Sequence, residues 1–198
     1  IIMCGIAGIM YKGEAQTFDT GEALIRMLDG CQHRGPDSTG FALYGEAQPG
    51  ELKLRFFLDD KSDSKTGIEV IQQRLSELGA VITAESEIGA NYRVTVKYDA
   101  DVQNLAYEME RAARVISIGT SLEIVKDVGS AHDVDDRYSV GEYQGSHGLG
   151  HVRLATESDV KPEASHPFWA TGFADVAIVH NGQITNYWKM RRRLEQRG

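Results

Sequence analysis

Met3-Cys4-Gly5-Ile6-Ala7-Gly8-Ile9-Met10-Tyr11 is a short apolar run with two glycines, close to the start of the chain. No charged side chain interrupts this run, so it lacks the polar face that an amphipathic helix would show. A short continuous apolar segment is typical of a buried strand. We therefore predict a core strand here, with Cys4 at its beginning.

Cys4 has a chemical option that depends on the residues before it. If residues 1–3 are removed, the α-amino group of Cys4 becomes free and lies within reach of its own thiol. A thiol has a pKa of about 8.5 and an α-amine one of about 7.7–8.0, so the amine can accept the thiol proton near neutral pH. Nucleophile and base would then come from one residue. The alternative is that Cys4 is a small buried apolar side chain, as most free cysteines are.

Composition narrows the class of protein. The 198 residues allow one large domain or two small ones, and the net charge of -8 argues against nucleic-acid and membrane-surface partners, which reward excess Lys and Arg. Cys4 and Cys31 are the only cysteines, so no disulfide framework is possible, and no paired cysteine and histidine spacing indicates a structural metal site. We expect a cytoplasmic protein with no membrane segment, no metal and no cofactor of its own.

The segment after the first strand contains a helix and a turn. Asp19 and Glu22 have the spacing of a capping box, and the apolar residues that follow recur at helical spacing up to Cys31. His33-Arg34-Gly35-Pro36-Asp37-Ser38-Thr39-Gly40 combines glycines and a proline with charged side chains, which predicts a tight turn. A short strand is expected over 41–44.

Residues 50–130 have a different pattern. Apolar periodicity predicts strands over 52–58, 80–84, 92–98 and 115–118, and helices over 68–78 and 101–113. The order βαββαβ is that of a ferredoxin-like unit, which can bury its own sheet under two helices. We interpret 50–130 as a module inserted into the main domain, and 131–145 as the return linker. The main domain then resumes with a strand over 148–156, a buried strand over 176–184 and a helix over 188–197.

Four segments of the main domain together resemble the glutaminase domain of class II glutamine amidotransferases, the N-terminal-nucleophile type. They are Cys4-Gly5-Ile6-Ala7-Gly8, His33-Arg34-Gly35-Pro36-Asp37-Ser38-Thr39-Gly40, Gly150-His151-Val152-Arg153-Leu154-Ala155-Thr156 and His180-Asn181-Gly182-Gln183-Ile184. The resemblance implies an α+β fold, a four-layer αββα sandwich, built from residues 1–49 and 146–198. The inserted module looks like that of amidotransferase subunits akin to glutamate synthase, including the N-methylglutamate synthase type.

The resemblance also implies catalytic roles. Cys4 would attack the side-chain amide carbon of L-glutamine, forming a thioester and releasing ammonia, with its own α-amine as base. The side-chain amide of Asn181 and the backbone N–H of Gly182 would stabilise the oxyanion of the tetrahedral intermediate. Without the other segments, Asn181-Gly182 would be interpreted as an ordinary hairpin turn.

The same resemblance assigns substrate-binding residues. Arg153 would pair with the α-carboxylate of glutamine, since a guanidinium can bind both oxygens at once. Thr156 would add a hydroxyl contact, and Arg34 would order the turn beside the nucleophile. The alternative for Arg153 is an ordinary surface ion pair. Glu157 stands where some relatives place a histidine, so this contact departs from the pattern.

Two further departures bear on activity. Ile1-Ile2-Met3 precede Cys4 and acylate its amine, so we expect no glutaminase activity until they are removed. The main domain has only about 100–110 residues without the insert, small for a four-layer sandwich. The acidic residue that would hold the α-amine of the substrate has no counterpart before Gly198. We therefore expect that the gene continues or that another chain completes the site.

Two functions from different classes follow. The first is a glutaminase that passes ammonia to an acceptor synthase subunit in a hetero-oligomer, where the resemblance implies a flavin-dependent, glutamate-synthase-like partner. The second is a non-catalytic regulatory or assembly subunit, in which the inserted module binds a partner or a small amino acid. The module could also be simple decoration of a surface loop.

Overall fold

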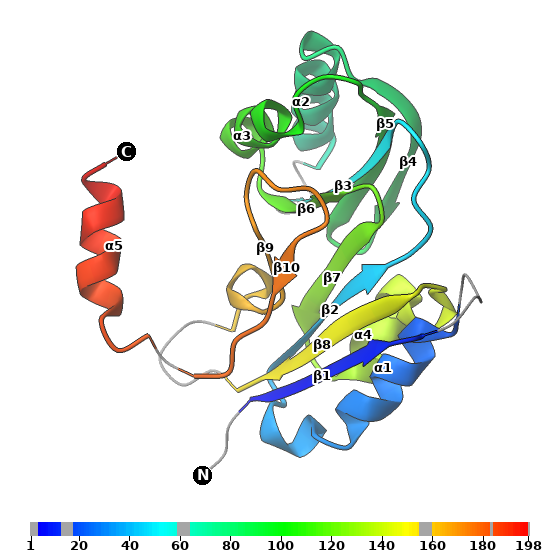
Figure 1. The fold of residues 1–198 in the computed structure, drawn as a ribbon, viewed down its shortest axis with the longest axis vertical. Helices are drawn as coiled ribbons and strands as arrows, with labels where there is room; N and C mark the ends of the chain where they lie inside the picture. Colours follow the sequence, from blue (N-terminus) through cyan, green and yellow to red (C-terminus); the bar gives the residue numbers. More distant parts are fainter. Residues whose placement is uncertain (1–3, 13–17, 59–63, 155–159, 183, 198) are drawn as a thin grey trace.

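The computed structural model describes residues 4–12, 18–58, 64–154, 160–182 and 184–197. The fold is mixed α+β, and its strands form antiparallel sheets (Figure 1). No helix in the described part of the chain is long and apolar enough to cross a membrane.

The first sheet contains the predicted N-terminal strand. Its order is β1-β8-β2-β7, and all neighbours are antiparallel. The strands are β1 (Gly5–Met10), β8 (His147–Arg153), β2 (Ser38–Tyr44) and β7 (Leu122–Val128). Helices α1 (Thr20–Asp29) and α4 (Ala131–Tyr138) cover one face of this sheet (Figure 1). Their apolar side chains, such as Leu24 and Val134, pack against Phe41 and Val152 of the strands.

The predicted burial of β1 is only half right. Ala7 is buried against α1, whereas Ile6 and Met10 are 43% and 68% exposed. Strand β1 pairs with β8 alone among the described strands, and Ile6 and Met10 lie on its second face. Side chains alternate between the two faces of a strand, so one face is buried and the other is open.

The predicted capping box of α1 is also wrong. Asp19 stands at the N-cap of α1, but its side chain makes no capping hydrogen bond. Its carboxylate instead accepts a hydrogen bond from the side-chain amide of Gln144. A long-range contact has therefore replaced the local one that the spacing of Asp19 and Glu22 indicated.

The second sheet lies within residues 51–119 and has the order β4-β5-β3-β6. The predicted succession of strands and helices is confirmed: β3 (Glu51–Phe57), α2 (Ser64–Glu77), β4 (Val81–Ile88), β5 (Asn91–Lys97), α3 (Val102–Ala112) and β6 (Val115–Gly119). Side chains of both helices, including Leu75 and Met109, pack with Leu54 and Val94 of the sheet in one core.

The chain returns to the first sheet directly from the second. Strand β7, which the sequence pattern did not reveal, pairs with β2 over its whole length. Residues 131–145, expected to be a return linker, contain α4 and the 3-10 helix η2 (Val140–Glu142). Ser130 and Asp133 form a capping box at the start of α4. Val134 on α4 belongs to the core of the first sheet, so this segment has a packing role there.

A buried ion network joins the two sheets. The Glu123 carboxylate on β7 accepts hydrogen bonds from Arg55 on β3 at 3.0 Å and from Arg93 on β5 at 2.6 and 2.8 Å. Burial by itself would raise the pKa of Glu123, but the bond from Arg93 and the charge of Arg55 outweigh it and lower that pKa to about 2. The two sheets are therefore connected through one ionised carboxylate.

The part of the chain after β8 begins along the second face of the first sheet, where Trp169 and Ala177 pack. It contains η3 (Pro162–Ala164), β9 (Phe168–Trp169), β10 (Ala177–Ile178) and α5 (Tyr187–Glu195), and the 3-10 helix η1 (Gln32–Arg34) lies earlier in the chain. The expected buried strand over 176–184 is wrong for most of its length, since β10 has two residues and Ile178 is 56% exposed. Helix α5 confirms the predicted C-terminal helix and projects away from the sheets (Figure 1).

Candidate active site

Cys4 lies at the start of β1, at the edge of the first sheet. Gly5 pairs with Val152 of β8, which places Cys4 level with Arg153 and Leu154. The backbone N–H of Leu154 donates to Cys4 Sγ at 3.4 Å, and the thiol lies 3.8 Å from the Leu154 carbonyl oxygen. The side chain is half-buried. The thiol is thus held by backbone groups of the neighbouring strand and keeps access to solvent.

Asn181 reaches Cys4 from the far end of the chain. Its side-chain Nδ2 donates to the backbone carbonyl oxygen of Cys4 at 2.8 Å, across 177 residues of sequence. Gly182 follows with φ +154°, a value that residues with a Cβ rarely adopt. A Cβ on Gly182 would also lie 3.1 Å from Nε2 of His180. The structure therefore brings an amide donor and a glycine backbone to the residue that carries the thiol.

Arg153 ends strand β8 beside Cys4 and is only 6% exposed. Its backbone carbonyl accepts a hydrogen bond from the Asp37 N–H at 3.1 Å. The turn that precedes Asp37 lies directly on β8, because a Cβ on Gly35 would be 2.5 Å from the carbonyl carbon and oxygen of Val152. Only glycine permits this approach. The turn before β2 and the end of β8 therefore meet at one place.

Arg34 lies in η1, next to that turn, and is half-buried. Its charge acts on the Cys31 thiol, whose pKa burial raises and Arg34 partly lowers. A Cβ on Gly5 would lie 2.7 Å from Cys31 Sγ, so Cys31 packs against the strand that carries Cys4. Arg34 is thus near the nucleophile strand. Thr156 and Glu157 lie outside the described residues.

Three histidines, His151, His166 and His180, lie near one another on the face of the sheet that carries Cys4. The ring of His151 on β8 is 1% exposed and lies 4.8 Å, between centroids, from the ring of His166. Burial is the main cause that lowers the pKa of both His151 and His166 to about 4, and the nearby charges of Arg153 and His180 act in the same direction. Both imidazoles are therefore neutral at pH 7.

This cluster was not predicted from the sequence: His151 was part of a strand motif and of an H-x3-H spacing with His147, and no spacing related it to His166 or His180. The pairing of His151 with Ile6 explains the grouping, because Ile6 and Cys4 lie on the same face of β1. A neutral imidazole can donate a hydrogen bond through one ring nitrogen and accept one through the other without adding charge to the site.

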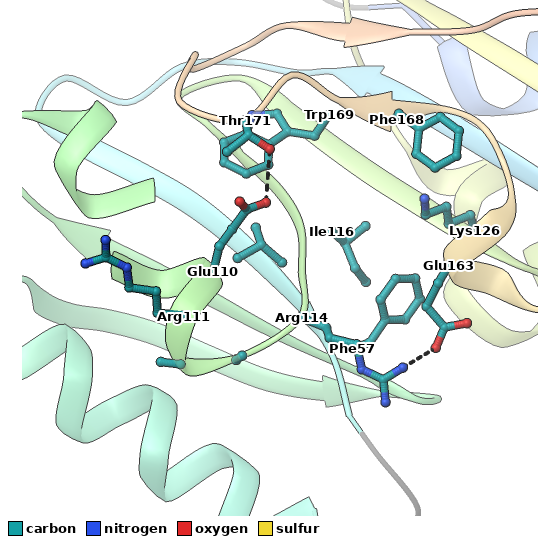
Figure 2. Close-up of a pocket in the computed structure, with 13 residues that line it drawn as sticks. Phe57, Glu110, Arg111, Arg114, Ile116, Lys126, Glu163, Phe168, Trp169 and Thr171 are labelled. Carbon is teal, nitrogen blue, oxygen red and sulfur yellow. Dashed lines mark hydrogen bonds and ion pairs between the residues drawn. The ribbon is translucent and has the colours of Figure 1, made fainter. Parts of the chain in front are cut away.

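A hollow of about 650 Å³ lies elsewhere, between α3, β6, β9 and the first sheet (Figure 2). Its lining does not include Cys4, Arg153 or Asn181. Its charged groups already have partners: Arg114 pairs with Glu163 at 2.7 Å, and Glu110 accepts from Thr171 at 3.0 Å (Figure 2). We therefore place the candidate active site at Cys4 and not in this hollow.

Lys126 lies at the wall of that hollow between the rings of Phe57 and Phe168 (Figure 2). Burial lowers the pKa of its ammonium to about 8, and the charge of Glu163 offsets part of that effect. Its Nζ donates to the backbone carbonyls of Ser165 at 2.8 Å and Pro167 at 3.2 Å. Lys126 thus fastens the 165–167 segment to the sheet.

No family model matches the chain, but comparison with curated proteins finds clear relatives. A protein of Methanothermobacter thermautotrophicus named "Putative glutamine amidotransferase" is 36% identical over 203 residues, which cover 99% of this chain and 66% of the relative. This chain is a homologue of glutamine amidotransferases. The "Glutamine amidotransferase-like protein GlxB" of Rhizobium meliloti is 35% identical over 197 residues, covering 99% of this chain and 64% of the relative.

More distant similarity is confined to part of the chain. The enzyme named "Glutamine--fructose-6-phosphate aminotransferase [isomerizing]" from Methanothermobacter thermautotrophicus is 31% identical over 97 residues, 49% of this chain and 16% of the relative. The two relatives that match 99% of this chain are longer than it, and the chain spans just under two thirds of their length.

Proposed function

We propose that this chain is the glutaminase part of a class II glutamine amidotransferase, which hydrolyses L-glutamine to glutamate and ammonia. The observation that carries the proposal is the hydrogen bond from Asn181 Nδ2 to the Cys4 carbonyl oxygen, because it joins the two motifs that the reaction needs at one point. Arg153, level with Cys4 on the next strand, adds a cation at the same place. The two relatives that match 99% of the chain carry glutamine amidotransferase names, which supports a glutaminase over a non-catalytic regulatory subunit.

The chemistry begins at Cys4. With residues 1–3 removed, the free α-amine takes the proton of the thiol, and the thiolate attacks the side-chain amide carbon of glutamine. The C–N bond then breaks, the nitrogen leaves as ammonia after receiving that proton, and a thioester remains on Cys4. A water molecule attacks the thioester, which releases glutamate and restores the thiol.

The tetrahedral intermediate needs fixed hydrogen-bond donors for its oxyanion. The Nδ2 of Asn181 is one, and the backbone N–H of Gly182 is the other. In the structure Nδ2 donates to the backbone carbonyl of Cys4, so the amide is already directed toward the nucleophile residue. A substrate oxyanion at this position would compete for the same N–H group. Donors of this kind contribute about 10²–10³ in rate each.

Substrate recognition falls to the polar groups around the end of β8. Arg153 binds the α-carboxylate of glutamine through its forked guanidinium, and Thr156 adds a hydroxyl contact. Arg34 orders the turn against which β1 and β8 rest. The buried position of Arg153 strengthens its pairing with a carboxylate, since water screens the charges less there.

The remaining parts of the proposal concern the assembly. The first sheet and its helices form half of the four-layer αββα sandwich, and residues 51–119 form the inserted ferredoxin-like module. The open face of β1 is where a second sheet would pack. Ammonia passes to a glutamate-synthase-like acceptor subunit, with flavin as the cofactor of that partner, in a cytoplasmic hetero-oligomer.

A glutamine-analogue electrophile tests the proposal directly. The protein with Cys4 as its first residue is incubated with 6-diazo-5-oxo-norleucine and digested, and the labelled peptides are identified by mass spectrometry. We expect a covalent adduct on Cys4 and none on Cys31, which serves as the internal control. Free L-glutamine should protect Cys4 from labelling. An unlabelled Cys4 in folded protein would refute the glutaminase.

A further inference from the structure

The β9–β10 hairpin carries the segment that reaches Cys4. It has only two residue pairs, Ala177 with Trp169 and Ile178 with Phe168. A two-stranded hairpin of this size is not stable by itself, so contacts outside it must fix its position. The chain continues from β10 through Val179 and His180 to Asn181. The position of the Asn181 amide therefore depends on whatever holds this hairpin.

The carboxylate of Asp175 accepts five hydrogen bonds that hold the hairpin. Asp175 precedes β10 with φ +61°, a left-handed conformation that is uncommon for residues other than glycine. Its Oδ1 accepts from the Ser121 N–H at 2.8 Å, the Ser121 hydroxyl at 3.0 Å and the Leu122 N–H at 2.8 Å. Its Oδ2 accepts from the Thr120 N–H at 3.1 Å and the Thr120 hydroxyl at 2.7 Å. Both carboxylate oxygens are thus fully engaged.

The contacts lie across more than 50 residues of sequence, so they are not a local turn motif. A Cβ on Gly119 would be 2.5 Å from Asp175 Oδ1, which shows how closely the carboxylate lies against the backbone. Burial raises the pKa of Asp175, but the hydrogen bonds from Thr120, Ser121 and Leu122 outweigh burial and lower that pKa below its ordinary value. The carboxylate is ionised at neutral pH.

The segment that Asp175 binds is a rigid point of the fold. Residues 119–122 are the connection between β6 of the second sheet and β7 of the first sheet (Figure 1). Leu122 is completely buried and pairs with Tyr44 of β2. Helix α3 adds a second contact to the hairpin, because the Thr171 hydroxyl donates to Glu110 at 3.0 Å (Figure 2).

We propose that Asp175 is a positioning residue for glutamine hydrolysis: its carboxylate ties the hairpin to the 119–122 connection and thereby sets the place of the Asn181 and Gly182 donors. This inference rests on the proposed glutaminase function. The 119–122 connection starts at the last residue of β6, so the second sheet helps to place the two donors. Asp175 itself touches no substrate atom.

The test is glutamine hydrolysis by Asp175→Ala and Asp175→Asn in the full protein with Cys4 as its first residue. We expect kcat of Asp175→Ala to fall about 10²-fold with KM unchanged, because displacing a catalytic group by about 1 Å costs on this order. Asp175→Asn keeps one acceptor oxygen but places an amide against the Thr120 N–H, so we expect an intermediate loss.

The matched control is Asp133→Asn on α4. Asp133 also accepts a backbone N–H and a hydroxyl, both from Ser130, but on the opposite face of the first sheet. Each kcat is divided by the folded fraction of the same preparation, which is measured by a melting curve. A merely structural role would lower the folded fraction and leave kcat per folded molecule unchanged.

Two outcomes are separable. If the parent protein does not hydrolyse glutamine, the proposed function fails. If the parent protein is active and folded Asp175→Ala and Asp175→Asn both keep its kcat, the glutaminase stands and the positioning role of Asp175 is overturned.

Discussion

The side-chain amide of Asn181 donates a 2.8 Å hydrogen bond to the backbone carbonyl of Cys4, although 177 residues separate them. An asparagine after a two-residue strand has no local reason to reach the first strand of the chain. The hairpin that precedes it packs against Ala42, Ile124 and Leu149 on the second face of the first sheet, and the chain then continues to Asn181 at Cys4. The contact places an amide donor at the residue that carries the thiol.

Asn181→Ala removes the proposed side-chain donor to the oxyanion. We expect kcat for glutamine hydrolysis to fall about 10²–10³-fold, because the negative charge of the intermediate loses a fixed N–H. Steady-state kinetics with L-glutamine measures this. Asn186→Ala, at the exposed N-cap of α5, is the control and should leave kcat unchanged. Equal kcat values for the two variants would contradict the role of Asn181.

Removal of Ile1–Met3 should create activity. While these residues are attached, the Cys4 nitrogen is part of an amide and cannot accept the thiol proton. We expect no glutamine turnover before removal and measurable ammonia release after it, followed in a coupled assay with Cys4→Ala as the blank. Equal turnover of both forms would rule out the amine as base.

Arg153→Lys should weaken glutamine binding. A lysine keeps the positive charge but loses the fork that binds both carboxylate oxygens, and a charge-assisted hydrogen bond contributes about 1.5–3 kcal/mol. We therefore expect KM to rise about 10–100-fold. Arg137→Lys is the control, because Arg137 forms an ion pair with Asp127 on the opposite side of the sheet. The prediction fails if KM is unchanged in a folded Arg153→Lys protein.

Protonation of the buried histidines should destabilise the fold in acid. Burial lowers the pKa of His151 and His166 to about 4, below the unfolded value of about 6.5, so the neutral form is favoured in the folded state. Their contribution is present above pH 6.5 and is lost as the pH falls from about 6.5 through 4.

We expect the free energy of unfolding to decrease over that window. His166→Phe should flatten the decrease, because it removes one titrating group and keeps an aromatic ring beside Phe168. Urea titrations at several pH values measure it. His33→Phe, at an exposed position of η1, is the control, because it makes the same replacement without changing a buried group. An unaltered slope in His166→Phe would show that His166 does not titrate in this range.

Local patterns were sufficient for many of the elements. The apolar run at 3–11 became β1, and the periodicity between 51 and 119 gave the correct succession of strands and helices. Periodicity fails where burial is decided by distant segments. Residues 176–179 are as apolar as β1, yet only Ala177 and Ile178 form a strand, since the described chain supplies few partners for them.

Tertiary structure changes how the insert is bounded. Strand β7 and helix α4 belong to the core of the first sheet, although their residues follow the insert without a break. Deleting 50–145 would therefore remove β7, the edge strand that pairs with β2, and helix α4 as well as the second sheet. Strand membership depends on register with a distant strand, which no local pattern records.

The sequence by itself determined the chemical types of the site: a cysteine before an apolar strand, an arginine at the end of a second strand and an Asn-Gly pair near the end of the chain. Residue types are local and can be read in order. Only the tertiary structure decided that Asn181 meets Cys4 and that His151 and His166 lie on the same face of the sheet as Cys4. It also decided that Asp175 of the hairpin binds the backbone at Leu122. These contacts depend on strand register and on which faces are covered, and both are properties of the whole fold.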